Sequence, residues 1–348
     1  MRIGLVGYGF GGRFFHAPLL TSLADAELVG VVTRADARRQ QLAADHPGVP
    51  AFDSLGQLAE AGVDLLAIST PLPGRAKLIH EAIEHGIAVV SDKPFAVDAD
   101  EASGLIAAAE ARGVPLSVYQ NRRWDSDFLT VRKLINDGAL GTVTHFESRF
   151  EVYAPQSLGD PSSGGVLRDL GSHLVDQALQ LFGPVASVYA ELYYSPLAPT
   201  VDYGFFVALR HRGGVISHLH GNKLQDAEPR RFRVTGTSGT YSVEGLDGQE
   251  AAALAGRSPR SEGERWGVEE HRRWGWLEHG GAREKIRSEH GNWPHFYQQV
   301  LAALRHGEPL PVDAREALQT VRILDAACRS HALGEVVKTR ADGGLENI

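Results

Sequence analysis

The chain has 348 residues, of which 43% are hydrophobic and 22% charged, and this length and composition predict a soluble globular protein with about two domains. Its formal net charge of -8 repels phosphate backbones and anionic lipids, which excludes nucleic acid and membrane surfaces as expected partners. The single cysteine, Cys328, excludes an internal disulfide and a cysteine-based zinc site, and it fits a reducing, cytoplasmic compartment. We expect no secretory signal and no membrane helix, because Arg2 leads straight into a strand pattern and no run reaches ~18 consecutive apolar residues.

Residues 1 to about 120 alternate short apolar runs with amphipathic stretches. The runs are rich in branched side chains and predict buried parallel strands at Ile3–Val6, Leu28–Val32, Leu65–Ser69, Val89–Ser91 and Leu116–Tyr119. Stretches between them, such as Ala76–His85 and Glu101–Arg112, have helical spacing. This rhythm predicts a doubly wound parallel sheet, which binds its ligand at the carboxyl ends of the strands.

A glycine motif follows the first predicted strand and precedes the helix-compatible stretch Arg13–Leu23. Gly7 permits a tight turn, Gly9 lets a pyrophosphate approach the backbone, and Gly12 lets the helix pack closely on the strand. The exposed amides and the helix N-terminus then hold the diphosphate. We therefore predict dinucleotide binding at Gly7, Tyr8, Gly9, Phe10, Gly11 and Gly12, with a merely flexible turn as the alternative.

The end of the second predicted strand, at Thr33 and Arg34, bears on the choice between NADP and NAD. Enzymes that use NAD usually place an acid here, whereas Thr33 brings no carboxylate and Arg34, aided by Arg38 or Arg39, can pair with a 2'-phosphate. We predict NADP as the cofactor. Asp36 keeps NAD compatible, and the arginines also fit a solvated helix start.

Lys93 follows the predicted strand Val89–Ser91, at the sheet edge where a nicotinamide would lie. It can donate to a substrate hydroxyl or carbonyl oxygen, and Pro94 restricts the local chain. A surface lysine after a strand is the alternative interpretation.

After about residue 122 the apolar runs are joined mostly by turns. They predict an antiparallel or mixed sheet with strands at Thr142–Phe150, Val185–Tyr194, Tyr203–Leu209, Val215–Leu219 and Arg231–Val234. One face of this sheet needs a cover, so we expect a homo-oligomer, either a homodimer or a homotetramer.

Asp169 and His173 lie one helical turn apart if the chain is helical from about Gly165, with Asp176 near the same face. Alcohol oxidation needs a base for the hydroxyl proton, and an imidazole titrates near working pH. We therefore predict His173 as the base and Asp169 as the group that orients it or the substrate. A capping Asp with a structural His, or an Asp/His metal site, are the alternatives. No metal is expected, because no further ligands are evident.

Two later segments differ in pattern. Gly256–Trp293 is rich in Arg, Glu, Gly and Trp with poor periodicity, and it predicts a long solvated polar loop. His295–Ala332 has strong helical spacing, interrupted at Gly307–Pro311.

The glycine turn, the Lys93-Pro94 pair and the segment Gly164–His173 together resemble the Gfo/Idh/MocA family, the group of glucose-fructose oxidoreductase and inositol dehydrogenase. The likeness spans nearly the whole chain and includes Val118–Asp125 and Asn292–Tyr297. It implies an N-terminal Rossmann domain over residues 1–122 and a C-terminal α/β domain over residues 123–348. The second domain would carry a large open, mostly antiparallel sheet used for substrate binding and oligomerisation, with helices from about 295 packing back on the first.

The resemblance implies catalytic roles for Lys93, Asp169 and His173. It also implies cofactor contacts from Ser69, Thr70, Pro71, Asp92, Lys93 and Asn121. Arg123, Trp124 and Tyr153 are candidates for substrate contact, and a structural role is equally compatible for each. The chain looks most like the NADP-dependent scyllo-inositol dehydrogenase branch.

Two departures from the family pattern stand out. Asp92 replaces the common Glu before Lys-Pro, and Leu72 and Arg75 replace the Asn and His that often follow Thr-Pro. Because of the second change, the resemblance does not carry the family's usual contacts near the nicotinamide ribose over to this chain.

The predicted function is NADP-linked hydride transfer at a hydroxyl or keto carbon of a cyclitol or sugar. A non-catalytic dinucleotide sensor, and an enzyme that keeps NAD(P) tightly bound for internal redox, are the alternatives.

Overall fold

The structure is a computed structural model that describes residues 1–196, 198–228, 230–340 and 344. The chain forms two compact units, each made of three segments. The first unit comprises Met1–Asn121, Gln249–Trp266 and Asn292–Leu318. The second comprises Arg122–Gly248, Gly267–Gly291 and Gln319–Ile348. The sequence predicted a single domain boundary at residue 122, whereas residues 249–266 of the structure belong to the first unit.

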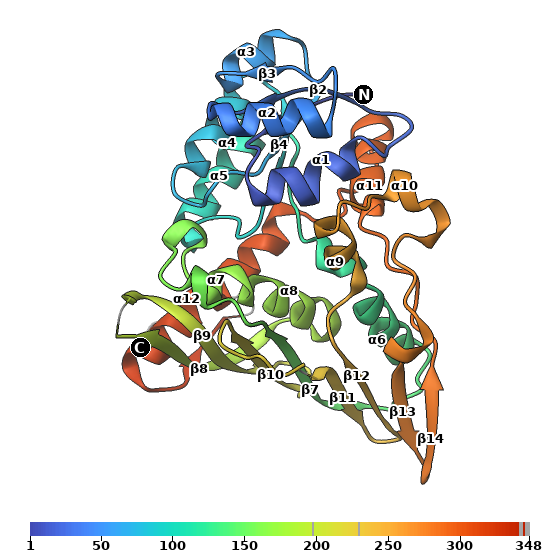
Figure 1. The fold of residues 1–348 in the computed structure, drawn as a ribbon. Helices are drawn as coiled ribbons and strands as arrows, with labels where there is room; N and C mark the ends of the chain where they lie inside the picture. Colours follow the sequence, from blue (N-terminus) through green and yellow to red (C-terminus); the bar gives the residue numbers. More distant parts are fainter. Residues whose placement is uncertain (197, 229, 341–343, 345–348) are drawn as a thin grey trace. The chain divides into compact units, whose positions relative to one another are not determined.

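The first unit is built on a parallel sheet of six strands in the order β3-β2-β1-β4-β5-β6 (Figure 1). The strands are β1 (Arg2–Val6), β2 (Glu27–Val32), β3 (Ala51–Phe52), β4 (Leu65–Ile68), β5 (Ala88–Ser91) and β6 (Leu116–Val118). The five predicted strands are confirmed, and β3 adds an edge strand too short to leave a pattern. The strand order reverses between β1 and β4, so this is the switch point at which such sheets bind nucleotides.

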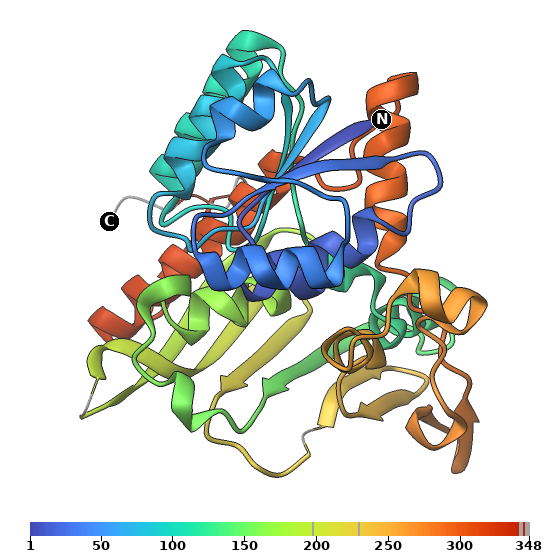
Figure 2. The ribbon, with the colours of Figure 1, turned by 45° about the horizontal axis from the view of Figure 1, so that its top comes forward.

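Helices flank this sheet, α1 and α2 on one face and α4 and α5 on the other (Figure 2). The helices of the unit are α1 (Ala17–Leu20), α2 (Asp36–Asp45), α3 (Leu55–Glu60), α4 (Arg75–Glu84), α5 (Ala99–Arg112), α9 (Gly248–Leu254), α10 (Pro259–Glu262) and α11 (Pro294–His306). The helix predicted at Arg13–Leu23 instead begins with a π-helical turn, Gly12–His16. Pro18 has no amide hydrogen to donate four residues back, which favours the wider turn before it.

The second unit is built on nine strands in the order β14-β13-β12-β11-β7-β10-β9-β8-β15. The strands are β7 (Val143–Glu151), β8 (Val185–Ser195), β9 (Ala198–His211), β10 (Ile216–Asn222), β11 (Arg230–Gly236), β12 (Thr240–Glu244), β13 (Gly275–His279), β14 (Ala282–Ile286) and β15 (Val337–Lys338). Within the described part of this second sheet, only β7 and β10 pair in parallel, and the other neighbouring strands pair antiparallel. The predicted α/β class with a mostly antiparallel second sheet is therefore confirmed.

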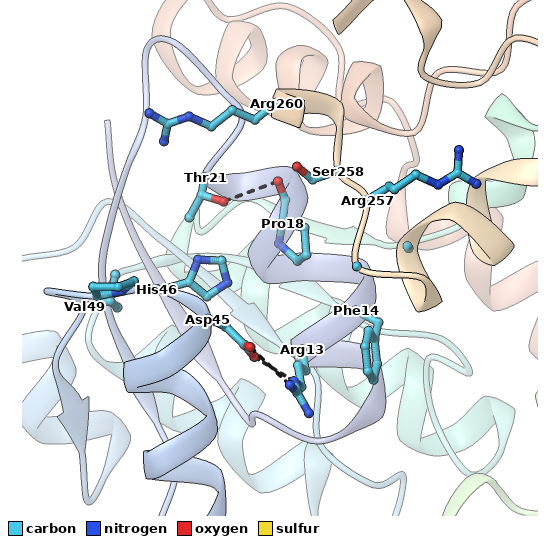
Figure 3. Close-up of a pocket in the computed structure, with 13 residues that line it drawn as sticks. Arg13, Phe14, Pro18, Thr21, Asp45, His46, Val49, Arg257, Ser258 and Arg260 are labelled. Atoms are coloured by element: carbon cyan, nitrogen blue, oxygen red, sulfur yellow. Dashed lines mark hydrogen bonds and ion pairs between the residues drawn. The ribbon is translucent and has the colours of Figure 1, made fainter. Parts of the chain in front are cut away.

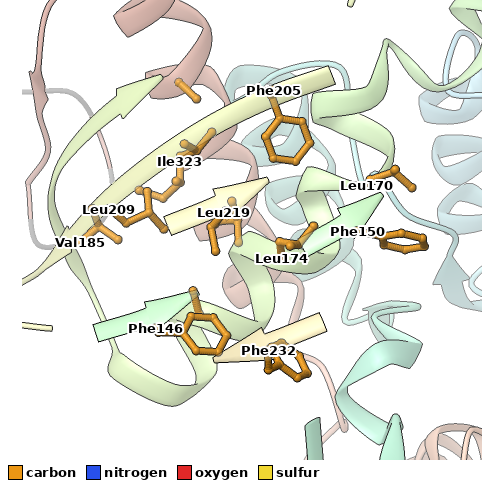
Figure 4. Close-up of a cluster of buried hydrophobic side chains, with 14 of the residues drawn as sticks. Phe146, Phe150, Leu170, Leu174, Val185, Phe205, Leu209, Leu219, Phe232 and Ile323 are labelled. Atoms are coloured by element: carbon orange, nitrogen blue, oxygen red, sulfur yellow. The ribbon is translucent and has the colours of Figure 1, made fainter. Parts of the chain in front are cut away.

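Four helices belong to this sheet: α6 (Ser126–Asn136), α7 (Val166–Asp169), α8 (Gly171–Phe182) and the later part of α12 (Ala314–Leu333). Short 3-10 turns occur at Asn121–Trp124, Pro155–Ser157, Pro161–Ser163, Gly263–Arg265 and His271–Arg273. The core lies between the helices and one face of the sheet, where Phe146 and Phe232 stack beside Leu174 of α8 (Figure 4). On the other face, alternate residues such as Phe206, His218 and His220 are only half-buried.

The prediction of a solvated loop at Gly256–Trp293 is wrong for the second half of this segment. There β13 and β14 form a hairpin that extends the sheet. The turn between them is Gly280-Gly281, and both residues have positive φ, 54° and 81°. A two-residue hairpin turn of the I′ type needs this backbone at both positions. The polar composition hid the strands, since one face of the hairpin carries charged side chains such as Arg283, whose guanidinium stacks over Trp276 at 4.2 Å.

No helix in the described part of the chain has both the length and the hydropathy needed to cross a bilayer.

Candidate functional site

The glycine turn leaves β1 at the switch point of the first sheet. Gly7 has φ of +100°, and a Cβ there would lie 2.3 Å from the Ser69 carbonyl oxygen. A Cβ on Gly12 would lie 2.1 Å from the carbonyl oxygen of Gly7 itself. The turn is therefore folded tightly against the end of β4, and neither position has room for a side chain.

The same turn is open on its outer side. Among the residues that the structure describes, a Cβ on Gly9 would meet only Arg38 Nη2, at 4.0 Å, so its backbone is accessible to a ligand. A Cβ on Gly11 would lie 2.6 Å from Ser69 Oγ and 2.8 Å from Asp92 Oδ2. A bare backbone cradle at a strand-to-helix turn fits a pyrophosphate, so the residues present fit a bound dinucleotide.

The Tyr8 side chain points away from this cradle. It is buried, and its hydroxyl donates to Asp45 Oδ2 at 3.0 Å. Arg13 donates to the same carboxylate at 2.6 and 3.1 Å. Partial burial acts to raise the pKa of Asp45, but the hydrogen bonds from Arg13 and Tyr8 outweigh it and the net pKa is lowered. Tyr8 therefore offers only its backbone to a ligand, whereas the Phe10 ring is exposed.

We predict that the Asp45→Asn variant is less stable than the wild type by about 1 kcal/mol at neutral pH. The pKa of Asp45 is lower in the folded state, so the charged carboxylate stabilises the fold above its ordinary pKa of about 4. This contribution is lost as the pH falls through the folded pKa. Urea unfolding across the acid range should show the difference shrinking below about pH 4. Glu60→Gln, at an exposed position, is the control; a difference that stays constant with pH would contradict the prediction.

Arginines gather at the start of α2, where a 2'-phosphate would lie. Arg34 is exposed and makes one hydrogen bond among the described residues, from Nε to the Asp53 carbonyl oxygen at 2.9 Å. Arg39 is paired with the Asp53 carboxylate at 2.5 Å, whereas Arg38 lies near Gly9. Of the two predicted helpers of Arg34, Arg38 is thus the better placed.

Asp92 lies directly beside the glycine turn, at the end of β5. Its Oδ2 accepts from Ser69 Oγ at 2.7 Å, and its Oδ1 accepts from the Lys93 amide at 2.8 Å. Burial acts to raise the pKa of Asp92, but the close approach of His16 and the charges of Arg75 and Lys93 outweigh it and hold the pKa well below its usual range. The carboxylate is therefore ionised, and it fixes the backbone from which the Lys93 side chain extends.

Sequence reasoning missed two residues behind Asp92. His16 is fully buried, with Nε2 3.3 Å from Asp92 Oδ2 and Nδ1 2.5 Å from the Tyr297 hydroxyl. Burial raises the pKa of Tyr297 well above its usual value, so the hydroxyl stays protonated and can donate to His16. The two residues are 281 positions apart, and no spacing rule connects them.

The residues after β4 and β6 that were predicted to contact the cofactor also belong to the first unit. Ser69 is buried, Thr70 is half-buried and Pro71 is exposed. Asn121 is buried at the end of the unit.

In the second unit, Asp169 and His173 lie on two short helices rather than on one. The helix α7 ends at Asp169, and Leu170 separates it from α8. The Leu170 carbonyl accepts from the His173 amide at 3.2 Å, a hydrogen bond over three residues instead of the four of a regular α-helix. Asp169 and His173 remain one turn apart. Lys223, just after β10, places its Nζ 3.3 Å from Asp169 Oδ2, a partner that the sequence analysis did not find.

A buried carboxylate fixes the start of α7. Asp202 Oδ2 accepts from the Leu167 amide at 2.7 Å. A Cβ on Gly165, which has φ of +95°, would lie 2.0 Å from Asp202 Oδ1. Gly165 thus serves the packing of β9 against α7.

One of the suggested substrate contacts, Arg123, is tied into the second unit. Arg123 is buried and donates to both carboxylate oxygens of Asp176, at 2.8 and 2.7 Å. Asp176, predicted near the same face as Asp169 and His173, is thus engaged in a buried ion pair with Arg123. Trp124 is half-buried, and Tyr153 is 59% exposed and free to meet a ligand on its outer face. Across the described residues, no group of three or more His, Cys, Asp or Glu side chains could hold a metal ion.

A cavity of about 490 Å³ in the first unit lies between α1, the end of α2 and the α9–α10 segment (Figure 3). Its wall includes the Arg13–Asp45 ion pair together with Phe14, His46 and Arg257. None of the predicted catalytic or cofactor residues lines it, so it is separate from the glycine cradle.

Comparison with known proteins matches both units. Residues 1–120 match the model of an oxidoreductase family with a NAD-binding Rossmann fold, GFO_IDH_MocA, and residues 132–339 match that family's C-terminal alpha/beta domain. The chain is 33% identical over 341 residues to the NADP(+)-dependent scyllo-inositol 2-dehydrogenase of Bacillus subtilis, covering 95% of this chain and 93% of the relative. It is 31% identical over 219 residues to D-apiose dehydrogenase of Paraburkholderia graminis, covering 61% and 58%.

Among solved structures, the chain is similar to the Bacillus subtilis protein yvaA, with a TM-score of 0.89 and 31% identity over 97% of this chain and 99% of the other. Sequence motifs, both sheets and these matches agree. The chain belongs to the Gfo/Idh/MocA family of oxidoreductases.

Proposed function

We propose that the protein is an NADP-dependent dehydrogenase that transfers a hydride between the nicotinamide and a hydroxyl or keto carbon of a cyclitol or sugar. The observation that carries the proposal lies within the first unit: the glycine turn is close to Asp92, which follows β5 and precedes Lys93. The ideal Cβ position of Gly11 lies 2.8 Å from Asp92 Oδ2, and Asp92 fixes the Lys93 backbone. A dinucleotide in the cradle would therefore reach Lys93.

The roles of the chain's own residues follow from their chemistry. When bound, the cofactor supplies the acceptor for the hydride that leaves the substrate carbon. Lys93 donates a hydrogen bond to the substrate oxygen, and an imidazole nitrogen of His173 takes the hydroxyl proton as the carbonyl forms. In ketone reduction, His173 returns that proton. Asp169, held by Lys223 at 3.3 Å, orients the proton acceptor or the substrate.

Two relatives support a cyclitol or sugar as the substrate, because their names give scyllo-inositol and D-apiose as the compounds they act on. A panel of cyclitols, aldoses and polyols, assayed for NADPH formation with NADP and NAD, tests it. Turnover of at least one ring hydroxyl is the expected result. Cofactor binding without turnover would favour the sensor, and protein purified with nucleotide but inert to added NADP would favour internal redox.

We propose NADP rather than NAD because of Arg34 and Arg38, and the scyllo-inositol relative is also NADP-dependent. Arg34→Ala should raise the KM for NADP by about 10- to 100-fold, since a charge-assisted phosphate contact contributes about 1.5–3 kcal/mol. The KM for NAD should change little. Arg112→Ala, at the exposed end of α5, is the matched control. An unchanged ratio of the two KM values would remove Arg34 from this role.

Assembly into a homodimer or homotetramer stays a prediction. We would place its contact on the face of the nine-stranded sheet that the helices of the second unit leave uncovered.

A further inference from the structure

Arg75 is a charged side chain in an unusual position. It is the first residue of α4 and is only 4% exposed. In the family pattern that the sequence resembles, this position is often His. Arg75 makes no direct ion pair with the described residues, so its buried guanidinium needs another set of partners, because burying a charge is costly.

Three backbone carbonyls provide those partners. Arg75 donates to the Thr70 oxygen from Nε at 3.1 Å and from Nη2 at 2.5 Å. Its Nη1 donates to the Asp92 oxygen at 2.6 Å and also to the Pro94 oxygen. Thr70 follows β4 and Asp92 follows β5, which are neighbours in the sheet. One side chain therefore ties together two loops at the carboxyl edge.

The residue held most directly by this arrangement is Lys93, because the carbonyls on both sides of it accept from the same Nη1. We propose that Arg75 is a positioning residue that braces the β4 and β5 loops and so sets the place of the Lys93 ammonium and the affinity for the dinucleotide. The role in turnover rests on the proposed function, whereas the bracing of the loops does not.

Only arginine provides this bond pattern. Its guanidinium has five N–H donors in one rigid plane, which reach three carbonyls at once. Lysine has three donors on one nitrogen, and histidine has at most two on a ring. Burial lowers the pKa of Arg75, and the negative charges of Asp92 and Glu101 oppose that change without cancelling it.

The experiment compares Arg75→Ala, Arg75→Lys and Arg75→His with the wild type, and uses Arg231→Lys as control. Arg231 is also fully buried, but it bonds Asp127 and Gln177 in the second unit. Three quantities are measured: the NADPH Kd by fluorescence titration, kcat on the best substrate of the panel at saturating NADP, and hydrogen exchange of the amides in residues 69–75 and 92–95.

Arg75→Ala should weaken NADPH binding about tenfold and lower kcat by about 10- to 100-fold, since small misplacement of a catalytic group has costs of this size. Amide protection in both loops should fall. Arg75→Lys should recover part of each loss, and added guanidinium ion should partly rescue Arg75→Ala but not Lys93→Ala. Arg231→Lys should lower the Tm while leaving the NADPH Kd and loop exchange unchanged.

Wild-type values of Kd, kcat and loop protection in a folded Arg75→Ala would overturn the proposal, as would loop exchange that changes equally in Arg231→Lys. If Arg75→Ala does not fold, Arg75→Lys carries the same test. If the wild type binds NADPH but oxidises nothing, the proposed function fails, and the exchange and binding arms still decide the role of Arg75.

Discussion

Lys93→Ala should lower kcat by about 100- to 10,000-fold, the range typical for loss of a group that acts on the reacting oxygen. The Asp92 carboxylate and the two carbonyls bonded to Arg75 hold the backbone of Lys93, so the loop has supports other than the ammonium group. The variant should therefore remain folded and bind NADPH with an affinity reduced by no more than about tenfold. Steady-state kinetics and a fluorescence titration measure the two effects separately.

Lys77→Ala, at an exposed position on α4, serves as the control and should keep wild-type kinetics. His173→Ala should lose kcat in the same range, because the variant has no imidazole to take the hydroxyl proton. If both groups act on the same proton transfer, the double variant should be hardly slower than the worse single variant. Turnover of Lys93→Ala at the wild-type rate would contradict the assignment.

Gly12→Ala should abolish measurable NADPH binding, an effect we put at about 100-fold or more in Kd, because the backbone of the turn must move to admit the methyl group. Its Cβ would lie 2.1 Å from the Gly7 carbonyl oxygen, which belongs to the rigid turn rather than to a flexible side chain. The Tm should fall as well, since the strain is present without ligand. Thermal unfolding with and without NADPH measures both.

Gly9→Ala separates packing from binding. Its Cβ would meet nothing closer than Arg38 at 4.0 Å, so the Tm without ligand should stay unchanged, while NADPH binding should weaken because the methyl group occupies the path of the pyrophosphate. Gly104→Ala is the matched control within α5, where nothing lies within 4 Å, and it should stabilise the protein by about 0.5–1 kcal/mol. NADPH binding by Gly9→Ala with wild-type affinity would argue against the cradle.

The local features of the chain could be predicted because each depends on neighbours in sequence. The branched apolar runs of β1, β2, β4, β5 and β6 have the period and length of buried strands, and the glycine turn carries its own geometry. Asp169 and His173 are four residues apart, so helical spacing alone brings them together even though α7 and α8 divide at Leu170. The hairpin of β13 and β14 was missed, because its polar composition outweighed the turn signal of Gly280-Gly281.

The sequence by itself therefore determined the fold class, the cradle and the type of chemistry, through patterns that repeat over a few residues. Only the tertiary structure showed which groups support them. Tyr297 reaches His16 from 281 positions away, and Lys223 reaches Asp169 from another strand end. Arg75, which as a sequence letter is only a departure from a family pattern, bonds three carbonyls of two loops. Such contacts join residues that are far apart in the sequence, so they produce no periodic pattern in a single sequence. They depend on how distant segments pack together in the folded chain.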